Sequence, residues 1–393
     1  MSRPLEGITI IDFTRYQQGP YATVMLSDLG ADVIKVEERT NGDLGRSLGL
    51  QPDGWCTYFE AHNRNKRSLT LDVRTEAGRD VIYRLVEKAD VVADNFRPGV
   101  MKRLGLDWES LSRINPRIIT ASASGFGSEG PKADRPSFDV IGQAVGGLMV
   151  LEGGGPGEVP HSVGAGLADQ VGAMVFALGI STAIIARELN GIGQHVDVSL
   201  LGSQIALQGL PILGFLRTGE QNLSRQRQNP LFTYFPCAND EYLVLGILDP
   251  KWWPDLCKVL DREDLAADER FATPFDRFWN AEALLSELDS AFRTRPRVEW
   301  MKLLDDADIP HGPVNDYASM ASEPQVIANR YVTTLEHPTF GEIRVVGTPI
   351  RMSRSETGPR STAPELGQHT EEILLAAGYD WTEIEKLKDD EVL

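Results

Sequence analysis

The first 125 residues alternate short apolar runs with longer segments of helical periodicity, and this alternation limits the fold more than any other feature of the chain. The apolar runs are residues 8–13, 32–37, 90–94 and 117–122, and the helical patterns cover residues 21–29, 76–88 and 98–104. Gly30 closes the first of these helices, as glycine commonly does at a helix end. Strands that alternate with helices form a parallel sheet. The sequence therefore predicts an α/β fold with a Rossmann-like, doubly wound core.

The composition of the sequence changes near Gly219, where a polar stretch without apolar periodicity begins. A chain of 393 residues exceeds the usual domain size of ~150 residues, so two domains are expected. We predict that residues 1–218 form the N-terminal part of a large Rossmann-like domain and that residues 219–230 form a linker. Residues 231–325 are predicted to form a smaller α+β domain, and residues 326–393 a second linker and the C-terminal part of the large domain.

Composition narrows the range of partners. The net charge of −18 argues against nucleic acid or an anionic membrane as the main partner. The three cysteines are widely spaced and form no metal motif, which favours a reducing compartment and no bound metal. The N-terminus lacks a signal-peptide core, and no uninterrupted apolar run approaches the ~18 residues of a membrane span. We expect a cytoplasmic enzyme.

Asp169 stands between a glycine-rich segment, residues 164–166, and a long apolar run, residues 171–189, that is typical of a buried helix. A carboxylate there meets unpaired backbone N–H groups and the positive end of the helix dipole. Both favour the charged form, so we expect Asp169 to be ionised at neutral pH. The position fits either a helix N-cap, the commonest role of Asp at a helix start, or a nucleophile.

Basic residues gather where the predicted strands end, at Lys66 and Arg67, at Arg97, and one helical turn later at Arg103. Ligands of open α/β sheets bind at the carboxyl ends of the strands, and Arg and Lys there suit phosphates. A polyanionic cofactor is therefore indicated. A dinucleotide is disfavoured, because the glycine pattern of residues 125–130 is followed by proline and polar residues rather than by a helix.

Short motifs in a fixed order extend this interpretation over nearly the whole chain. They include residues 4–7, 30–37, 65–68, 94–99, 103–106, 124–127, 191–199, 309–314, 337–338 and 366–370. In these motifs the chain resembles the class III coenzyme A transferases, or CaiB/BaiF family, which includes formyl-CoA:oxalate CoA-transferase-like enzymes. The resemblance implies a Rossmann-like large domain, a small domain between two linkers, and two subunits threaded through each other as interlocked rings.

The resemblance also assigns roles to residues. It implies that Asp169 is the nucleophile and that CoA or acyl-CoA is bound as a substrate. The residues that match the CoA pocket are Tyr16, Gln17, Leu71, Asn95, Phe96 and Arg103, with Lys66, Arg39 and Arg74 as further neighbours of the phosphates or the adenine. Gln17, Tyr58 and Phe138 match positions that contact the carboxylic acid.

The chemistry that the resemblance implies is CoA transfer from an acyl-CoA to a carboxylic acid through an anhydride and a CoA thioester of Asp169. Backbone N–H groups near Asp169 are the expected oxyanion donors. Residues 153–157 are either a cover that excludes water or a surface loop. Oxalate-specific members carry a glycine run where residues 226–232 have none, and a Tyr in place of Phe138, so we expect a bulkier or partly apolar acid.

Two alternatives remain at this point. The family contains α-methylacyl-CoA racemases, which need a His base at the position that Phe138 fills. The chain could also bind CoA esters without catalysis.

Overall fold

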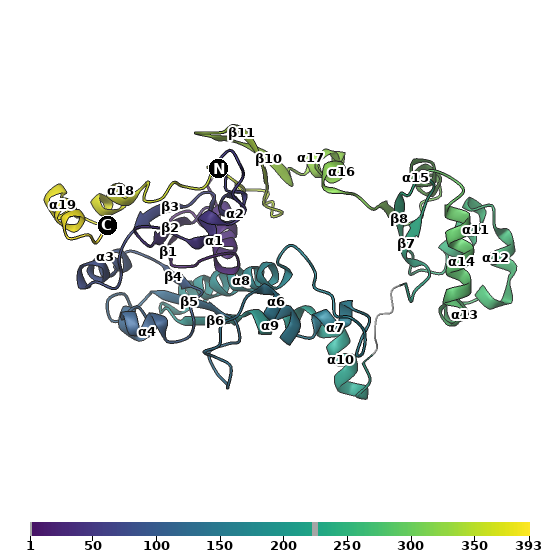
Figure 1. Ribbon diagram of the computed structural model, residues 1–393, viewed down its shortest axis with the longest axis horizontal. Coiled ribbons are helices and arrows are strands. Elements are labelled where there is room, and N and C mark those ends of the chain that lie inside the picture. Colours follow the sequence, from purple (N-terminus) through teal and green to yellow (C-terminus); the bar gives the residue numbers. More distant parts are fainter. Residues whose placement is uncertain (1, 222–226) are drawn as a thin grey trace. The chain divides into compact units, whose positions relative to one another are not determined.

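The computed structural model describes residues 2–221 and 227–393, and it divides into two compact units (Figure 1). The first unit comprises residues 1–152, 160–221 and 325–393, and the second comprises residues 153–159 and 222–324. Residues 222–226 of the expected linker lie outside the described ranges. The boundaries expected at residues 218, 230 and 325 stay predictions.

A six-stranded parallel sheet forms the centre of the first unit, in the order β3-β2-β1-β4-β5-β6. Its strands are β1 (Thr9–Asp12), β2 (Asp32–Glu37), β3 (Arg67–Thr70), β4 (Val91–Asp94), β5 (Ile119–Ser124) and β6 (His195–Ser199). This is the strand order of a doubly wound Rossmann fold. The predicted α/β class is therefore confirmed, and the carboxyl ends of all six strands lie at one edge.

Helices cover both faces of this sheet. On one face α1 (Gln18–Asp28) and α8 (Leu167–Asn190) lie against each other and pack on β1, β2, β4 and β5. On the other face α3 (Glu76–Val86) packs together with α18 (Thr370–Ala376) and α19 (Trp381–Asp389). The C-terminal segment thus shares a hydrophobic core with the first 120 residues.

Shorter elements complete the first unit. They are η1 (Leu44–Ser47), α2 (Thr57–Asn63), α4 (Val100–Leu104), α5 (Trp108–Leu111), α6 (Asp139–Val145), α7 (Leu148–Glu152), α9 (Leu200–Leu207), α10 (Gly209–Thr218) and α17 (Pro324–Ala328), with the antiparallel pair β10 (Val332–His337) and β11 (Gly341–Val346). The helical segment from residue 200 to residue 218 is not continuous. It is divided at Gln208, because Pro211 lacks the N–H that a continuous helix would need.

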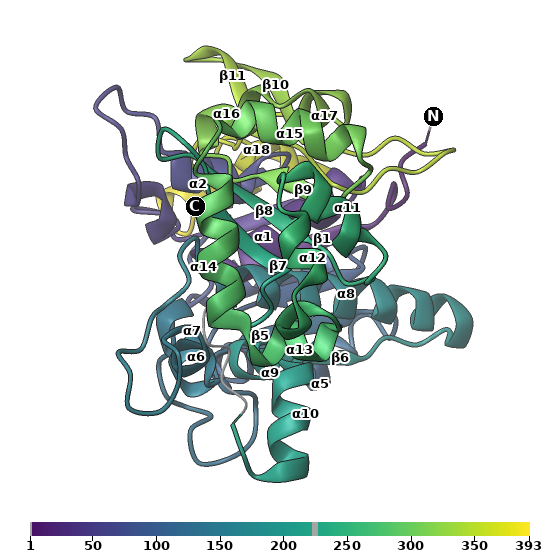
Figure 2. The same cartoon turned by 90° about the vertical axis from the view of Figure 1, so that its right-hand side faces the viewer.

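The second unit has its own core around a three-stranded antiparallel sheet, β7-β8-β9, as the smaller α+β domain requires (Figure 2). Its strands are β7 (Phe232–Pro236), β8 (Tyr242–Gly246) and β9 (His311–Pro313). Its helices are α11 (Trp252–Val259), α12 (Glu263–Ala267), η2 (Glu269–Phe271), α13 (Pro274–Trp279), α14 (Ala281–Phe292), α15 (Arg297–Asp306) and α16 (Tyr317–Ser322).

Helix α8 is long and apolar enough to cross a membrane by length and composition, although we expected no such helix. Its inner face belongs to the core of the first unit, where Phe176 and Ile180 are fully buried. Near its end, buried Arg187 forms an ion pair with Asp90 at 2.7 Å. These contacts make α8 a structural part of the Rossmann-like unit.

Candidate active site

A pocket of about 420 Å³ opens at the carboxyl edge of the sheet, beside β1, β4 and β5. Its walls come from the β1–α1 turn, the segment after β4, the segment before α6 and the start of α8. The lining residues are Arg15, Tyr16, Gln17, Gln18, Asn95, Phe96, Arg97, Pro98, Ala123, Ser124, Gly125, Ala133, Arg135, Pro136, Ser137, Phe138, Asp169 and Leu200. We call it the Asp169 pocket.

Backbone hydrogen bonds hold the β1–α1 turn at its edge. Tyr16 has a left-handed backbone, with φ 65°, which is uncommon for a residue other than glycine. Its N–H donates to the carboxylate of Asp43 over 3.2 Å. Next to it, the Arg15 N–H donates to Asn95 Oδ1 and Asn95 Nδ2 donates to the Arg15 carbonyl, both over 2.8 Å. These contacts fix the turn that presents Gln17 to the pocket.

Two buried ion pairs lie beneath this turn. Lys66 Nζ is 3.0 Å from Asp12, and Lys35 Nζ is 2.8 Å from Asp43. Burial lowers the pKa of Lys66 to about 8 despite the nearby carboxylate. Burial alone would raise the pKa of Asp12, but Lys66 and Lys35 outweigh it and hold that pKa below its ordinary value. Both members of the Asp12 pair are therefore charged at neutral pH and support the turn from inside.

Asp169 is not the N-cap of α8, contrary to one of our two interpretations. The helix begins at Leu167, the capping position is Gly166 with φ 66°, and Asp169 is the third helical residue. The free amides are instead satisfied by Asp139, whose Oδ1 accepts from Ala168 N over 2.6 Å and from Asp169 N over 3.1 Å. Asp139 thus takes two of the backbone donors that we expected to stabilise an oxyanion.

The carboxylate of Asp169 itself accepts no hydrogen bond from residues 2–221 or 227–393. Burial, followed by the negative charge of Asp139, raises its pKa from 3.8 to about 7. We expected Asp169 to be ionised at neutral pH, whereas a pKa of about 7 divides it between its charged and its neutral form. The dipole of α8 is offset by Asp139, and a desolvated carboxyl without donors favours its neutral form.

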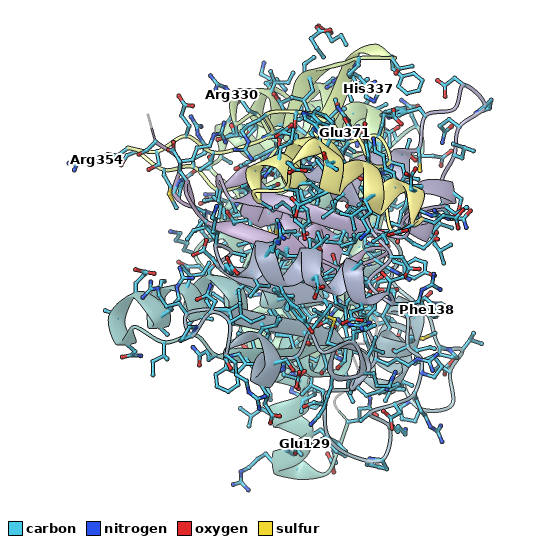
Figure 3. The ribbon with its side chains drawn as sticks, turned by 90° about the vertical axis from the view of Figure 1, so that its left-hand side faces the viewer. Glu129, Phe138, Arg330, His337, Arg354 and Glu371 are labelled. Atoms are coloured by element: carbon cyan, nitrogen blue, oxygen red, sulfur yellow. The ribbon has the colours of Figure 1, made fainter. Side chains whose placement is uncertain are left out.

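The structure brings together most of the predicted site residues but not all of them. Those lining the Asp169 pocket are Tyr16, Gln17, Asn95, Phe96, Phe138 and Asp169. Phe138, labelled in Figure 3, is 57% exposed, and its ring meets that of Tyr16 edge-on at 5.8 Å. Burial raises the pKa of Tyr58, and the negative charge of the nearby Asp169 raises it further.

The remaining predicted residues lie elsewhere. Lys66 and Leu71 are enclosed, at 2% exposure each, in the ion pair with Asp12 and in the hydrophobic core. Neither side chain lines the Asp169 pocket, and their assignment to the CoA pocket stays a prediction. Arg103 is exposed on α4, outside the pocket. Arg39 and Arg74 follow β2 and β3, where they pair with Glu391 and Asp72.

Sequence reasoning missed several lining residues. Arg15 and Arg135 were not named from the sequence, and together with Arg97, which was named at a strand end, they add positive charge around Asp169. Gln18 is buried in the wall, and its Nε2 has no partner among the described atoms. Arg15 and Gln18 flank residues that we had singled out, so the strand-end rule could have found them. The role of Asp139 could not be seen, because it depends on a contact across 30 residues.

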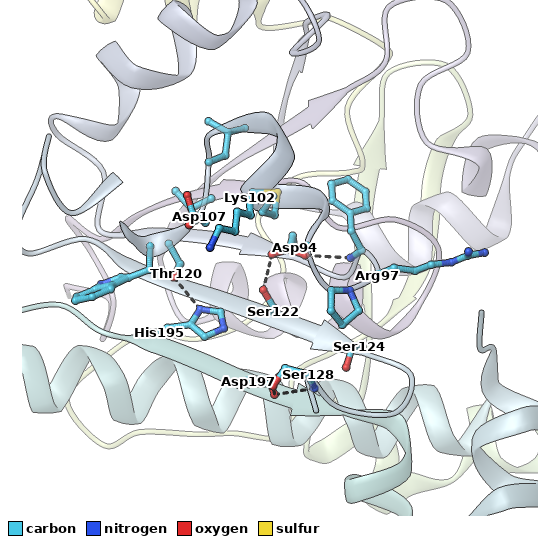
Figure 4. Close-up of a pocket in the computed structure, with 17 residues that line it drawn as sticks. Asp94, Arg97, Lys102, Asp107, Thr120, Ser122, Ser124, Ser128, His195 and Asp197 are labelled. Atoms are coloured by element: carbon cyan, nitrogen blue, oxygen red, sulfur yellow. Dashed lines mark hydrogen bonds between the residues drawn. The ribbon is translucent and has the colours of Figure 1, made fainter. Parts of the chain in front are cut away.

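A second cavity, of about 200 Å³, lies between β4, β5 and β6 and the segment of α4 and α5 (Figure 4). Its carboxylates already have donors: Asp94 accepts from Ser122 Oγ over 2.7 Å, and Asp197 from Ser128 Oγ over 2.6 Å. Burial raises the pKa of Asp94 to about 6. Among the described residues that line either cavity, Asp169 is thus the carboxylate that stands without a hydrogen-bond donor.

A sequence model of CoA-transferase family III matches residues 5–370. The chain belongs to this family. Two relatives that are named CoA-transferases support the family assignment. An acetyl-CoA:oxalate CoA-transferase of Acetobacter aceti is 35% identical over 368 residues, covering 93% of each chain. A succinyl-CoA:glutarate CoA-transferase of Mus musculus is 34% identical over 391 residues, covering 98% of this chain and 89% of the other.

Solved structures agree with the fold. The crystal structure of a CaiB/BaiF family protein from Brucella suis superposes with a TM-score of 0.85 at 33% identity, covering 96% of this chain and 100% of the other. The predicted family is therefore confirmed. The protein is an enzyme of the family III CoA-transferase class, whose substrates are CoA thioesters. An exclusively CoA-binding, non-catalytic role does not fit this class.

Proposed function

We propose that the enzyme moves CoA from an acyl-CoA to a carboxylic acid by covalent catalysis at Asp169. The observation that carries this proposal is the state of that carboxylate. It is largely buried, accepts no hydrogen bond from the described residues, and opens into a pocket with three arginines. A carboxylate without donors keeps its lone pairs available for attack on a carbonyl carbon.

The exchange consists of two half-reactions, and in each of them every bond that breaks is matched by one that forms. Asp169 attacks the thioester carbonyl, the carbon–sulfur bond breaks, and CoA thiolate leaves an acyl–aspartyl anhydride. The thiolate attacks the aspartyl carbonyl of that anhydride and releases the donor acid, which leaves an aspartyl-CoA thioester. The acceptor carboxylate then attacks this thioester and displaces the thiolate. Attack of the thiolate on the new acyl carbonyl forms the product acyl-CoA and restores Asp169.

Side-chain amides are the donors that fit each tetrahedral oxyanion. The amides of Ala168 and Asp169 are occupied by Asp139, whereas Gln17 and Gln18 both line the pocket. Gln17 Nε2 makes only a 3.4 Å contact with the Ala165 carbonyl. A preorganised donor of this kind is typically worth a factor of about 100 to 1,000 in rate.

Positive charge indicates the place of the polyanionic part of CoA. Arg15, Arg97 and Arg135 line the Asp169 pocket, and Arg39, Arg74 and Arg103 lie beyond it near the ends of β2, β3 and β4. Arg binds phosphate oxygens in a bidentate manner. We place the thioester end of CoA at Asp169 and its phosphates along this carboxyl edge of the sheet.

Chemical trapping tests the nucleophile. The protein is incubated with an acyl-CoA and then with hydroxylamine, which converts an aspartyl anhydride or thioester into a hydroxamate that mass spectrometry locates. We expect the hydroxamate on Asp169, its loss in Asp169→Ala, and its retention in Asp134→Asn, which changes an exposed acid instead. A modification elsewhere, or full transfer activity of Asp169→Ala, would refute the mechanism.

The racemase alternative lacks a base on the wall where it would be needed. Phe138 lines the pocket there and cannot abstract a proton. Incubation of an acyl-CoA in deuterium oxide separates the two reactions, since a racemase incorporates deuterium at the α-carbon without moving CoA. We expect CoA movement without deuterium incorporation.

We further propose that the enzyme is a homodimer, as the interlocked rings of the resemblance imply. Apolar side chains are exposed along α8, α9 and α10, among them Leu178, Leu189, Leu210 and Leu216 at 66%, 79%, 86% and 73% exposure. Apolar surfaces of this kind mark protein interfaces. Light scattering during gel filtration is expected to give twice the 43.3 kDa mass of the chain, and a 43.3 kDa peak would refute the dimer.

A further inference from the structure

A third cavity, of about 610 Å³, lies on the other side of Gln17 from the main body of the Asp169 pocket, within the first unit. Its walls come from α1, α2, β11, the segment before α2 and the start of α8. The lining residues are Gln17, Tyr21, Trp55, Thr57, Tyr58, Glu60, Ala61, His62, Arg64, Ala165, Gly166, Gln170, Arg344, Val345 and Val346. We call it the aromatic cleft.

Gln17 lines both this cleft and the Asp169 pocket, so the two cavities are adjacent at this residue. Its amide approaches the Ala165 carbonyl at 3.4 Å, and a side chain at Gly166 would meet its Nε2 at 2.3 Å. Two consecutive residues of α8 then face different spaces, Asp169 the pocket and Gln170 the cleft. An acyl carbonyl held at Asp169 therefore stands at the boundary of the cleft.

Four aromatic side chains line the cleft, those of Tyr21, Trp55, Tyr58 and His62. His62 contacts Tyr58 with ring centres 4.7 Å apart and Tyr21 at 5.9 Å. Burial lowers the pKa of His62 to about 4, so that ring is neutral at physiological pH. Rings without charge present large apolar contact areas to a ligand.

The charged groups of the cleft offer little to a second carboxylate. Arg64 is buried and bound to Asp28, with contacts of 3.2 and 2.6 Å. Glu60 is a buried acid, and in its ionised form it would repel a further anion. Arg344 belongs to the exposed rim, where water screens its charge. An uncharged, apolar body fits this lining better than a dicarboxylate.

We propose that the aromatic cleft binds the hydrocarbon body of the acyl group exchanged at Asp169, so that the enzyme acts on monocarboxylic acids with a medium-length alkyl or an aryl body. This inference rests on the proposed function, because it places the reacting carbonyl at Asp169. It adds no step to the exchange: the bonds that break and form are those between the acyl carbon, the CoA sulfur and the Asp169 oxygen.

Binding of unreactive thioethers tests the cleft without turnover. Isothermal titration calorimetry of the full chain compares S-ethyl-CoA with S-hexyl-CoA, which differ only in the alkyl body. Each buried methylene contributes about 0.8 kcal/mol, or about a four-fold gain in affinity. We expect S-hexyl-CoA to bind more tightly by up to that factor for each added methylene, with a more negative heat-capacity change. Equal affinity of the two thioethers would overturn the proposal.

Ala61 provides a matched pair of variants, because it is exposed on α2 and lines the cleft. Ala61→Trp is expected to remove most of the advantage of S-hexyl-CoA and to leave S-ethyl-CoA unchanged, whereas Ala61→Ser leaves both unchanged. If the Trp variant weakens both thioethers equally, the alkyl body does not occupy the cleft. A carboxylate-terminated thioether of the same length that binds more tightly than S-hexyl-CoA would also overturn the assignment to monocarboxylic acids.

The experiments distinguish a wrong assignment of the aromatic cleft from a wrong mechanism at Asp169. If Asp169 yields a hydroxamate with acyl-CoAs of every length at equal rates, the nucleophile stands and the cleft assignment fails. If S-hexyl-CoA binds preferentially in an Ala61-dependent manner but no acyl-CoA modifies Asp169, the cleft assignment stands and the mechanism fails.

Discussion

Replacing Asp169 with asparagine is expected to abolish CoA transfer and, at the same time, to stabilise the protein in a pH-dependent way. The carboxyl is largely buried without a donor, and burial and Asp139 raise its pKa from 3.8 to about 7. The folded state therefore binds the proton more tightly than the unfolded chain does. A raised carboxyl pKa favours folding at low pH, and this contribution is lost as the pH rises from 3.8 through 7.

The magnitude follows from the two pKa values. Relative to the protonated state, ionisation of Asp169 opposes folding by about 2 kcal/mol at pH ~5.5 and by about 4 kcal/mol at pH ~8.5. These are upper limits, because part of the side chain remains accessible to solvent. Asparagine has the same shape and no charge to desolvate. Its advantage over the wild type is therefore expected to increase by up to about 2 kcal/mol between the two pH values.

Thermal unfolding of both proteins at the two pH values measures this difference. Both values are above the isoelectric point of about 4.8. For a chain of this size the added advantage at the higher pH corresponds to a gain in Tm of a few degrees. Asp134→Asn, on the exposed segment before α6, is the control and should show no pH-dependent gain. A Tm difference that is the same at both pH values, or that decreases at the higher one, would refute the reasoning.

Three further changes test the surroundings of Asp169. Asp139→Asn removes the nearby negative charge but keeps an oxygen for the amides, so the rise of kcat/KM with pH, expected near 7 in the wild type, should move to lower pH. Gly166→Ala should lower kcat by about 100-fold with a smaller effect on Tm, because the new Cβ meets Gln17 Nε2 at 2.3 Å. Lys66→Met should destabilise the fold by about 3–5 kcal/mol in urea unfolding, because Asp12 stays buried without its main partner.

Each of these changes has a comparison that isolates its cause. If the pH profile of kcat/KM is unchanged in Asp139→Asn, the negative charge of Asp139 does not set the pKa of Asp169. Gly191→Ala, at the other end of α8, introduces a similar left-handed strain with no atom within 4 Å, and it should leave kcat intact. Lys88→Met, on the exposed surface, should change stability by less than about 0.5 kcal/mol. Equal losses for the two lysine variants would contradict the role assigned to the buried pair.

The sheet could be predicted from the sequence because its determinants are local. Each apolar run of four to six residues became a strand: β1, β2 and β4 lie within the predicted ranges, and β5 (Ile119–Ser124) extends two residues beyond the predicted range 117–122. The helix with the strong apolar periodicity at residues 76–88 was placed within two residues of the observed ends of α3. Short helices such as α2 and α6 were missed, because so few residues establish no clear period.

The candidate site was predicted less completely, because side-chain roles depend on contacts distant in sequence. The resemblance named Gln17, Asn95 and Phe96, and the strand-end rule named Arg97; all four line the Asp169 pocket. The same rule pointed to Lys66, whose ammonium instead turns inward to Asp12, 54 residues earlier in the chain. A lysine at the edge of a strand looks the same in sequence whether it meets a phosphate or a buried carboxylate.

The distinction between a capping and a reactive aspartate has the same origin. A carboxylate at a helix start is stabilised by the amides that it accepts from, and a donor-rich environment lowers its pKa and its basicity. Here two carboxylates meet one helix start, and Asp139 takes the amides of Ala168 and Asp169. Asp169 is consequently left without donors and beside a like charge, and both conditions raise its pKa toward 7. Capping satisfies a carboxylate with donors whereas the proposed nucleophilic attack needs it free of them, so the division between Asp139 and Asp169 supports the proposed role of Asp169.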